Sequence, residues 1–245
     1  VGEYKDLWMN AQKTDKTEHI FALQHSLSYL PSQYGISYLG KEENGWYDYV
    51  GDPVFFKNFP DDKRKKFCYV TSTVDTQGNQ IEWEDFDIGA PFIRKYRNYG
   101  GCGTYGIEGN TATRSSLSEG LTPIYRFADV LLIYAEASNK AEGSPNTLAY
   151  KCLNRVRDRA FGDQSHQYAG LTPEKFADAV FDEFGWENVF EFKRWFQLVR
   201  TEKVDEAVGK NTAIGARLNA NKENYLFPIP VRQCELRGWK NNPGY

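Results

Sequence analysis

The sequence predicts a mainly α-helical fold with long loops and a few short strands. From about residue 121 onward, apolar residues recur at helical spacing, whereas the earlier residues form short alternating runs interrupted by Gly, Asn and Asp. We therefore expect one domain over residues 1–245, loop-rich with short strands over 1–120 and helical over 121–245. At 245 residues and 40% hydrophobic content, the chain is long enough to bury a sizeable core.

Three helices are expected in the second part. Apolar residues at 127, 130, 131, 134, 137 and 141 form a helical stripe that Pro123 introduces and Gly143 ends. A second helix follows Ser144 and Pro145 and ends at Gly162, so that the two form an antiparallel pair. A third begins with Thr172 as N-cap and Pro173 in its first turn. A short helix is expected at 192–199, after a bend at Gly185.

The first part is predicted to contain extended segments and irregular connections. Alternating residues at 19–24, 66–74, 80–84 and 92–99 indicate strands, and residues 76–79 indicate a hairpin turn. Residues 29–60 and 100–120 follow neither period and are expected to be long loops. The two prolines of residues 226–230 (LFPIP) predict an extended strip that packs on a neighbouring surface, followed by a turn at residues 241–244.

Charge, apolar run length and cysteine spacing exclude several classes of protein. The net charge is −3 and no block of like charge occurs, so neither a nucleic acid nor an anionic membrane is an expected partner. The longest apolar run is far shorter than a spanning helix needs. The four cysteines lack metal-site spacing; two disulfides in any of three connectivities or free thiols remain open, and we favour free thiols, with Cys152 buried.

Catalytic motifs are weak or incomplete, so we expect neither an enzyme nor a cofactor or metal site. Residues 101–106 (GCGTYG) match the letters of a dinucleotide-binding loop, but no amphipathic helix follows them. Carboxylates cluster at 42–43, 61–62 and 84–87, yet turn-borne acids are more often solvated or capping groups than a glycosidase pair. Three isolated histidines and the absence of G-x-S-x-G give no support for hydrolysis.

Aromatic residues make up 16% of the chain and gather in the predicted loop of residues 29–49. A flat ring with a polar tip suits the apolar face and hydroxyl edges of a sugar. Trp46 is the leading candidate for ligand contact, because its neighbours form turns, and the further candidates are Tyr47, Tyr49, Tyr34 and Tyr38. The alternative interpretation is that such rings pin the loop to the body of the protein. Trp195, Leu198 and Val199 are instead expected to form one core face.

Several motifs in register resemble the SusD/RagB family. They are residues 125–137 (YRFADVLLIYAEA), 153–157 (LNRVR), 194–200 (RWFQLVR), 226–230 (LFPIP) and 242–245 (NPGY). The chain departs from the family pattern at Phe184, Phe192 and Gln197, where Arg, Gly and Asp are usual. The resemblance implies the carboxy-terminal half of a tetratricopeptide-containing α-helical fold. The quoted motifs are structural, so no ligand residue transfers from them.

What the resemblance implies about function is a non-enzymatic, outward-facing outer-membrane lipoprotein of Bacteroidetes type. Such a protein binds a nutrient glycan and delivers oligosaccharide to a SusC-like TonB-dependent transporter, and its lipid anchor is the only membrane association. The chain begins at Val1 without a leader-like segment, so we expect that it starts after processing or is the later part of a longer protein. The alternative is a subunit that binds peptide, or the transporter alone.

Overall fold

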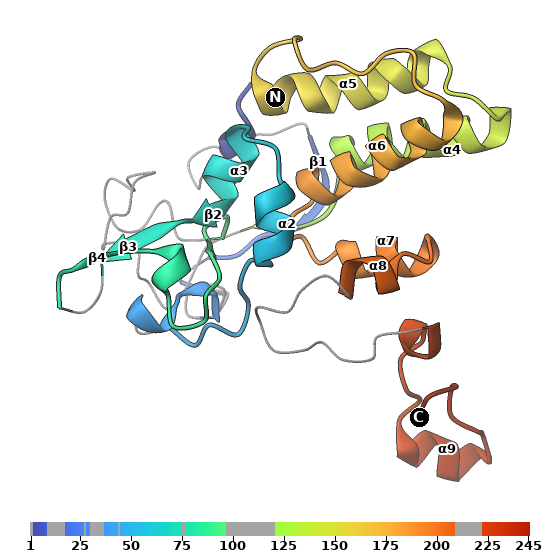
Figure 1. The fold of residues 1–245 in the computed structure, drawn as a ribbon. Helices are drawn as coiled ribbons and strands as arrows, with labels where there is room; N and C mark the ends of the chain where they lie inside the picture. Colours follow the sequence, from blue (N-terminus) through green and yellow to red (C-terminus); the bar gives the residue numbers. More distant parts are fainter. Residues whose placement is uncertain are drawn as a thin grey trace. The chain divides into compact units, whose positions relative to one another are not determined.

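The computed structural model describes residues 2–8, 18–26, 28–29, 37–43, 45–74, 77–96, 121–208 and 222–245 (Figure 1). The chain forms two compact units, Val1–Phe192 and Lys193–Tyr245, which we describe separately. The described residues are mainly helical, with short strands paired in twos. The predicted fold class is therefore confirmed.

The first unit contains the longer helices and the described strands. Its helices are α2 (Pro53–Asn58), α3 (Lys63–Cys68), α4 (Phe127–Glu142), α5 (Thr147–Phe161) and α6 (Pro173–Glu187), with 3-10 turns at Tyr4–Leu7, Lys41–Glu43 and Trp83–Asp85. Its strands are β1 (His19–Leu23), β2 (Tyr69–Val70), β3 (Ser72–Val74), β4 (Gln80–Glu82), β5 (Phe92–Ile93) and β6 (Thr122–Arg126). They form the antiparallel pairs β1–β6, β2–β5 and β3–β4.

The ends of α4, α5 and α6 follow from local sequence chemistry. Gly143 and Gly162 end α4 and α5 in left-handed backbone, with φ of 72° and 87°, which glycine adopts without a Cβ clash. The Thr172 hydroxyl accepts the Lys175 N–H at the start of α6. The helices predicted here are confirmed. Helix α6 continues past Gly185 to Glu187, and Pro123 lies in β6 rather than at the start of a helix.

Helix α4 turns a different face to the core from the one its sequence suggested. Its buried residues include Ala128, Leu132 and Ala135, which pack against α5 and α6. Phe127, Val130 and Tyr134 of the predicted stripe are instead exposed. Because α4 is apolar on both faces, periodicity alone could not identify the buried one.

Exposed apolar side chains occur on the outward face of α4 and on the adjoining strands β1 and β6. We call this set the β1–β6/α4 surface; its members are Ile20, Phe21, Leu23, Tyr125, Phe127, Val130, Ile133 and Tyr134. Phe21 pairs with Tyr125 across the two strands, and α4 follows β6 directly. The set therefore combines residues from two segments of the first unit that lie far apart in the sequence.

The predicted strands of residues 66–74 and 92–99 are shorter than expected. Residues 66–68 belong to α3, because the buried Asp62 carboxylate accepts the N–H groups of Arg64 and Lys65 and so starts a helix. Residues 69–70 and 72–74 are extended, as predicted. Residues 95–96 lie beyond β5, and residues 97–99 fall outside the described residues. The hairpin is confirmed: β3 pairs with β4, and Gly78 has φ of 92°.

An aromatic core holds the loop-rich part of the first unit together. Tyr4, Trp8, Tyr38, Phe56 and Tyr69 belong to this core, as do rings from the segments around α3, β5 and Trp83. Helix α2 begins at Pro53 and is capped by Asp52. It lies within residues 29–60, so the prediction of a long loop there was wrong for this segment. Much of the high aromatic content is thus structural, as the loop-pinning interpretation proposes.

Buried ion pairs connect α3, β6 and α6. Arg126 donates to Glu18, Glu187 and Glu191 at 2.9, 2.8 and 2.7 Å. Arg64 donates to Asp62 and Glu183, each at 2.7 Å, and Lys95 to Glu191 at 2.6 Å. Arg157 pairs with Glu183, and Arg159 with Glu18 and Glu187. The network sets five cations against five carboxylates, so that the buried charges compensate one another.

The second unit contains α7 (Arg194–Arg200), α8 (Val204–Val208), a 3-10 turn at Lys222–Tyr225 and α9 (Val231–Arg237). In α7, Leu198 is buried as predicted, whereas Trp195 and Val199 are half-buried. Residues 226–230 form neither a helix nor a strand, and the Asn241 amide binds both the N–H and the carbonyl of Ile229. The side chains of Leu226 and Phe227 are exposed within this unit. The predicted packing of the strip on a neighbouring surface stays a prediction.

Cys68 and Cys152 are buried and, like Cys234, carry free thiols; Cys102 lies outside the described residues. Burial raises the pKa of the Cys68 thiol to about 11, so the thiol stays protonated at neutral pH. Among the residues that the structure describes, no helix combines the length and the apolar character needed to cross a membrane.

Candidate functional site

Three of the five predicted ligand-binding residues are exposed on one segment of the first unit. Trp46, Tyr47 and Tyr49 expose 53%, 38% and 52% of their surface. Tyr38 is 2% exposed and belongs to the aromatic core, so its ring is not available to a ligand in this conformation. Tyr34 lies outside the described residues. Among the described residues, the exposed candidates are therefore Trp46, Tyr47 and Tyr49; we call residues 46–49 the aromatic loop. Tyr34 stays a prediction.

Backbone hydrogen bonds fold the aromatic loop back onto the segment before it. The N–H groups of Tyr47 and Tyr49 donate to the carbonyls of Leu39 and Ser37 at 3.0 and 3.4 Å. A Cβ at Gly45 would lie 2.1 Å from the Leu39 carbonyl oxygen, so this close approach requires glycine. Tyr47 has φ of 43°, a conformation that non-glycine residues seldom adopt. The exposed rings thus stand on a backbone fixed by several contacts.

The ring of Tyr49 joins the aromatic loop to the core and to a distant part of the chain. It meets Tyr38 at a centroid distance of 5.6 Å and an angle of 77°. Its second neighbour is Phe192, at 6.2 Å and 88°. Phe192 was not among the candidate residues predicted from the sequence. The sequence did contain one indication, because Phe192 stands where the family usually has glycine.

Charged side chains occur in and just before the aromatic loop, and one of them interacts with Tyr47. Lys41 donates to Asp87 at 2.9 Å, a hydrogen bond that raises the pKa of the lysine, and the Lys41 charge also interacts with Tyr47. Glu42 accepts the Asp87 N–H at 2.6 Å. Asp48 is exposed between Tyr47 and Tyr49. Flat apolar rings beside exposed donors and acceptors can bind a ligand that has apolar faces and hydroxyl edges.

The acidic clusters have structural partners rather than the arrangement of an acid–base pair. Asp62 caps α3 and binds Arg64, and Glu43 accepts the Thr73 hydroxyl at 3.0 Å. Asp87 pairs with Lys41. Within the described ranges, no group of three or more His, Cys, Asp or Glu side chains is placed to hold a metal ion. The glycine-rich residues 101–106 lie outside these ranges.

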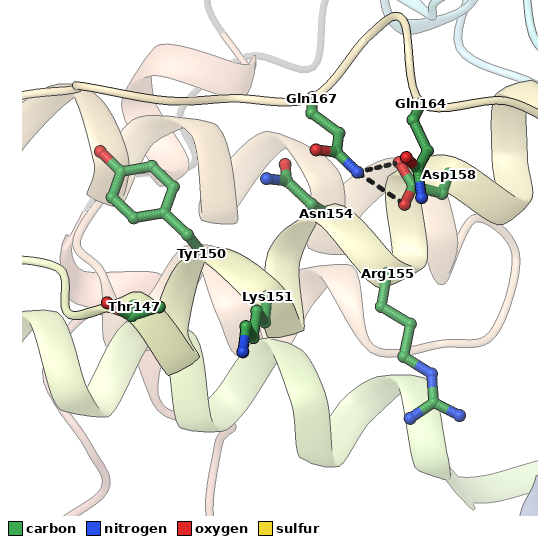
Figure 2. A pocket seen from close by; sticks show the side chains of 8 residues that line it. All are labelled: Thr147, Tyr150, Lys151, Asn154, Arg155, Asp158, Gln164 and Gln167. Atoms are coloured by element: carbon green, nitrogen blue, oxygen red, sulfur yellow. Dashed lines mark hydrogen bonds between the residues drawn. The ribbon is translucent and has the colours of Figure 1, made fainter.

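A polar hollow of about 400 Å³ lies along α5 and the loop that follows it (Figure 2). Its lining residues are Thr147, Tyr150, Lys151, Asn154, Arg155, Asp158, Gln164 and Gln167. Figure 2 shows the Gln167 amide hydrogen-bonded to both oxygens of Asp158, at 3.0 and 2.8 Å. The Tyr150 ring packs on Phe176 at 4.9 Å. The hollow, which sequence reasoning missed, offers hydrogen-bonding groups and the partly buried Tyr150, whereas the aromatic loop offers three exposed aromatic residues.

Comparison with known proteins identifies the family of the chain. The sequence model of the SusD family matches residues 39–245. SusD-like protein P2 of Formosa agariphila is 34% identical over 175 residues, which are 67% of this chain and 32% of that protein. The chain therefore spans about a third of the length of this curated relative.

Solved structures show the same fold. A SusD superfamily protein from Parabacteroides distasonis has a TM-score of 0.74 at 24% identity, covering all of this chain and 53% of that one. A SusD-like carbohydrate-binding protein from Bacteroides fragilis has a TM-score of 0.75 at 19% identity, covering 96% and 56%. The fold thus corresponds to about half of each structure. Together with the family match over most of the sequence, this similarity shows that the chain belongs to the SusD family.

Proposed function

We propose that this chain is a glycan-binding part of an outer-membrane uptake complex and delivers oligosaccharide to a SusC-like TonB-dependent transporter. Proteins of the SusD family are non-catalytic binding proteins, and the similar Bacteroides fragilis protein is described as carbohydrate-binding. We also propose that the whole protein is an outward-facing lipoprotein, with the residues of 1–245 forming one functional domain. Its membrane association would then reside in a lipid anchor.

The exposure of Trp46, Tyr47 and Tyr49 on a fixed loop is the observation that supports glycan binding most directly. Exposure of an aromatic side chain to water is unfavourable compared with its burial. This loop nevertheless keeps three aromatic residues partly exposed, whereas other rings of the same unit are buried in its core. Stacking of a sugar on Trp46 would cover that surface without moving the backbone. The polar hollow on α5 lacks an equally exposed ring, so we place the glycan at the aromatic loop.

The test is native affinity electrophoresis of the chain in gels containing amylopectin, xylan, laminarin, mannan or pectin. We expect at least one polysaccharide to retard the wild-type chain and Trp46→Ala to weaken that retardation. By analogy with other aromatic stacking platforms, the loss should be about 1–3 kcal/mol of affinity. Trp239→Ala is the matched control, because Trp239 is 55% exposed and lies outside the aromatic loop.

The outcomes separate this proposal from its alternative. Retardation lost in Trp46→Ala but kept in Trp239→Ala, with equal melting temperatures, supports a glycan site at the aromatic loop. No retardation by any of the polysaccharides contradicts the proposal and favours a subunit that binds peptide or the transporter alone. Unfolding of Trp46→Ala would instead identify Trp46 as a loop anchor.

A further inference from the structure

Phe192, the last residue of the first unit, combines two unfavourable properties. Its φ of 60° lies in the left-handed region, where a side chain crowds the backbone. The residue is also 49% exposed. A glycine at this position would relieve the backbone and expose no apolar ring.

A nearby residue shows how the fold compensates for the same backbone conformation elsewhere. Phe190 has φ of 64°, and its ring packs against the aromatic core, 4.9 Å from the Tyr69 ring centroid. Burial of a large ring can offset the unfavourable backbone there. Phe192 contacts Tyr49 but keeps half of its surface exposed, so burial offsets less of its strain. Strained, exposed positions of this kind occur often at ligand contacts.

The turn that presents Phe192 is fixed from inside the molecule. The buried Glu191 carboxylate accepts hydrogen bonds from Lys95 at 2.6 Å and from Arg126 at 2.7 and 3.0 Å. The Glu191 N–H donates to Asn188, and the Tyr96 hydroxyl donates to the Phe190 carbonyl, each at 3.0 Å. The two residues that precede Phe192 are therefore held in place by these hydrogen bonds, as a preorganised contact requires.

We infer that Phe192 is a further glycan-binding residue, which forms a second stacking position beside Tyr49 and contacts a sugar ring next to the one at the aromatic loop. This inference rests on the proposed function. The two rings stand at 88° to each other, so a single flat sugar cannot lie on the faces of both. A ligand that uses both positions needs successive rings, and Phe192 should therefore matter more for longer oligosaccharides than for a disaccharide.

Phe192→Gly tests the inference cleanly, because glycine tolerates the left-handed backbone while the stacking ring is removed. The probes are the hexasaccharide and the disaccharide of whichever polysaccharide retards the wild-type chain, with binding measured by titration calorimetry. We expect about a tenfold loss of hexasaccharide affinity, little change for the disaccharide, and an unchanged or higher melting temperature. Glu202→Gly is the matched backbone control, because Glu202 also has positive φ, at 56°.

The results distinguish this inference from the function on which it rests. If Trp46→Ala weakens binding while Phe192→Gly leaves both affinities unchanged, the Phe192 position is refuted and the proposed function stands. If no polysaccharide binds the wild-type chain, both are refuted. Phe192→Leu separates stacking from apolar contact: full hexasaccharide affinity in that variant would overturn the stacking role.

Discussion

At Glu187, one buried carboxylate faces the guanidinium groups of Arg64, Arg126 and Arg159. Burial alone would raise the pKa of Glu187, but the charges of Arg159, Arg126 and Arg64 lower it to about 2. The side chain therefore remains ionised throughout the physiological range. The three arginines cannot lose their protons, so they need the negative charge of Glu187 to compensate their buried positive charges.

Glu187→Gln should destabilise the first unit by about 3–5 kcal/mol, because it leaves buried guanidinium groups without their shared counter-charge. Asp87→Asn is the control: Asp87 belongs to an exposed pair with Lys41, and its loss should cost under about 1 kcal/mol. Urea denaturation followed by circular dichroism measures both. Equal effects of the two substitutions would contradict a special role for the buried network.

Helix α4 shows how far an element can be inferred from its own residues. Its buried Leu132 and exposed Ile133 are adjacent in the sequence and similar in size, but they lie on different faces. The aliphatic residues on both faces satisfy helix periodicity equally well. Tertiary contacts with α5 and α6 select the buried face.

Leu132→Ala should cost about 2–5 kcal/mol, because it leaves a cavity against α5 and α6. Ile133→Ala should cost under about 1 kcal/mol, because half of that side chain is already in contact with water. Thermal denaturation of the two variants, run side by side, measures the difference. A larger shift for Ile133→Ala than for Leu132→Ala would contradict the assignment of Leu132 to the packed face.

Local chemistry explains which features were predictable. Helix ends at Gly143, Gly162 and Thr172 depend on residues within one turn, and all three were found from the sequence. The exposure of Trp46 likewise followed from its turn-forming neighbours. The burial of Tyr38 depends on rings distant in the sequence, such as Tyr96, so no local pattern could reveal it.

At the scale of the whole molecule, the buried ion pairs make folding dependent on pH. The unfolded chain binds a proton at Glu187 near the ordinary pKa of about 4.3, whereas the folded chain binds it only near 2. Between these values the unfolded state holds more protons, so stability falls as pH falls. The contribution is complete above the ordinary pKa and is lost as the pH falls through about 2.

We expect the urea midpoint of the wild-type chain to decrease steadily between pH 5 and pH 2. The decrease should be shallower in Glu187→Gln, because that variant lacks the carboxylate with the lowered pKa. Midpoints measured across this range for both chains test the linkage. Parallel curves would show that other carboxylates cause the acid sensitivity.

The β1–β6/α4 surface has a practical consequence for the behaviour of this chain in solution. Eight large apolar side chains meet water there, and apolar surfaces of this kind promote adhesion between molecules. We expect the folded chain to enhance the fluorescence of anilinonaphthalene sulfonate and to scatter more light per molecule as its concentration rises. Ile133→Lys should reduce both signals without lowering the melting temperature. If the wild-type chain stays monomeric at high concentration and does not enhance the fluorescence of the dye, these side chains are covered in solution. If the signals do appear, colloidal association rather than unfolding sets the working concentration of the isolated chain.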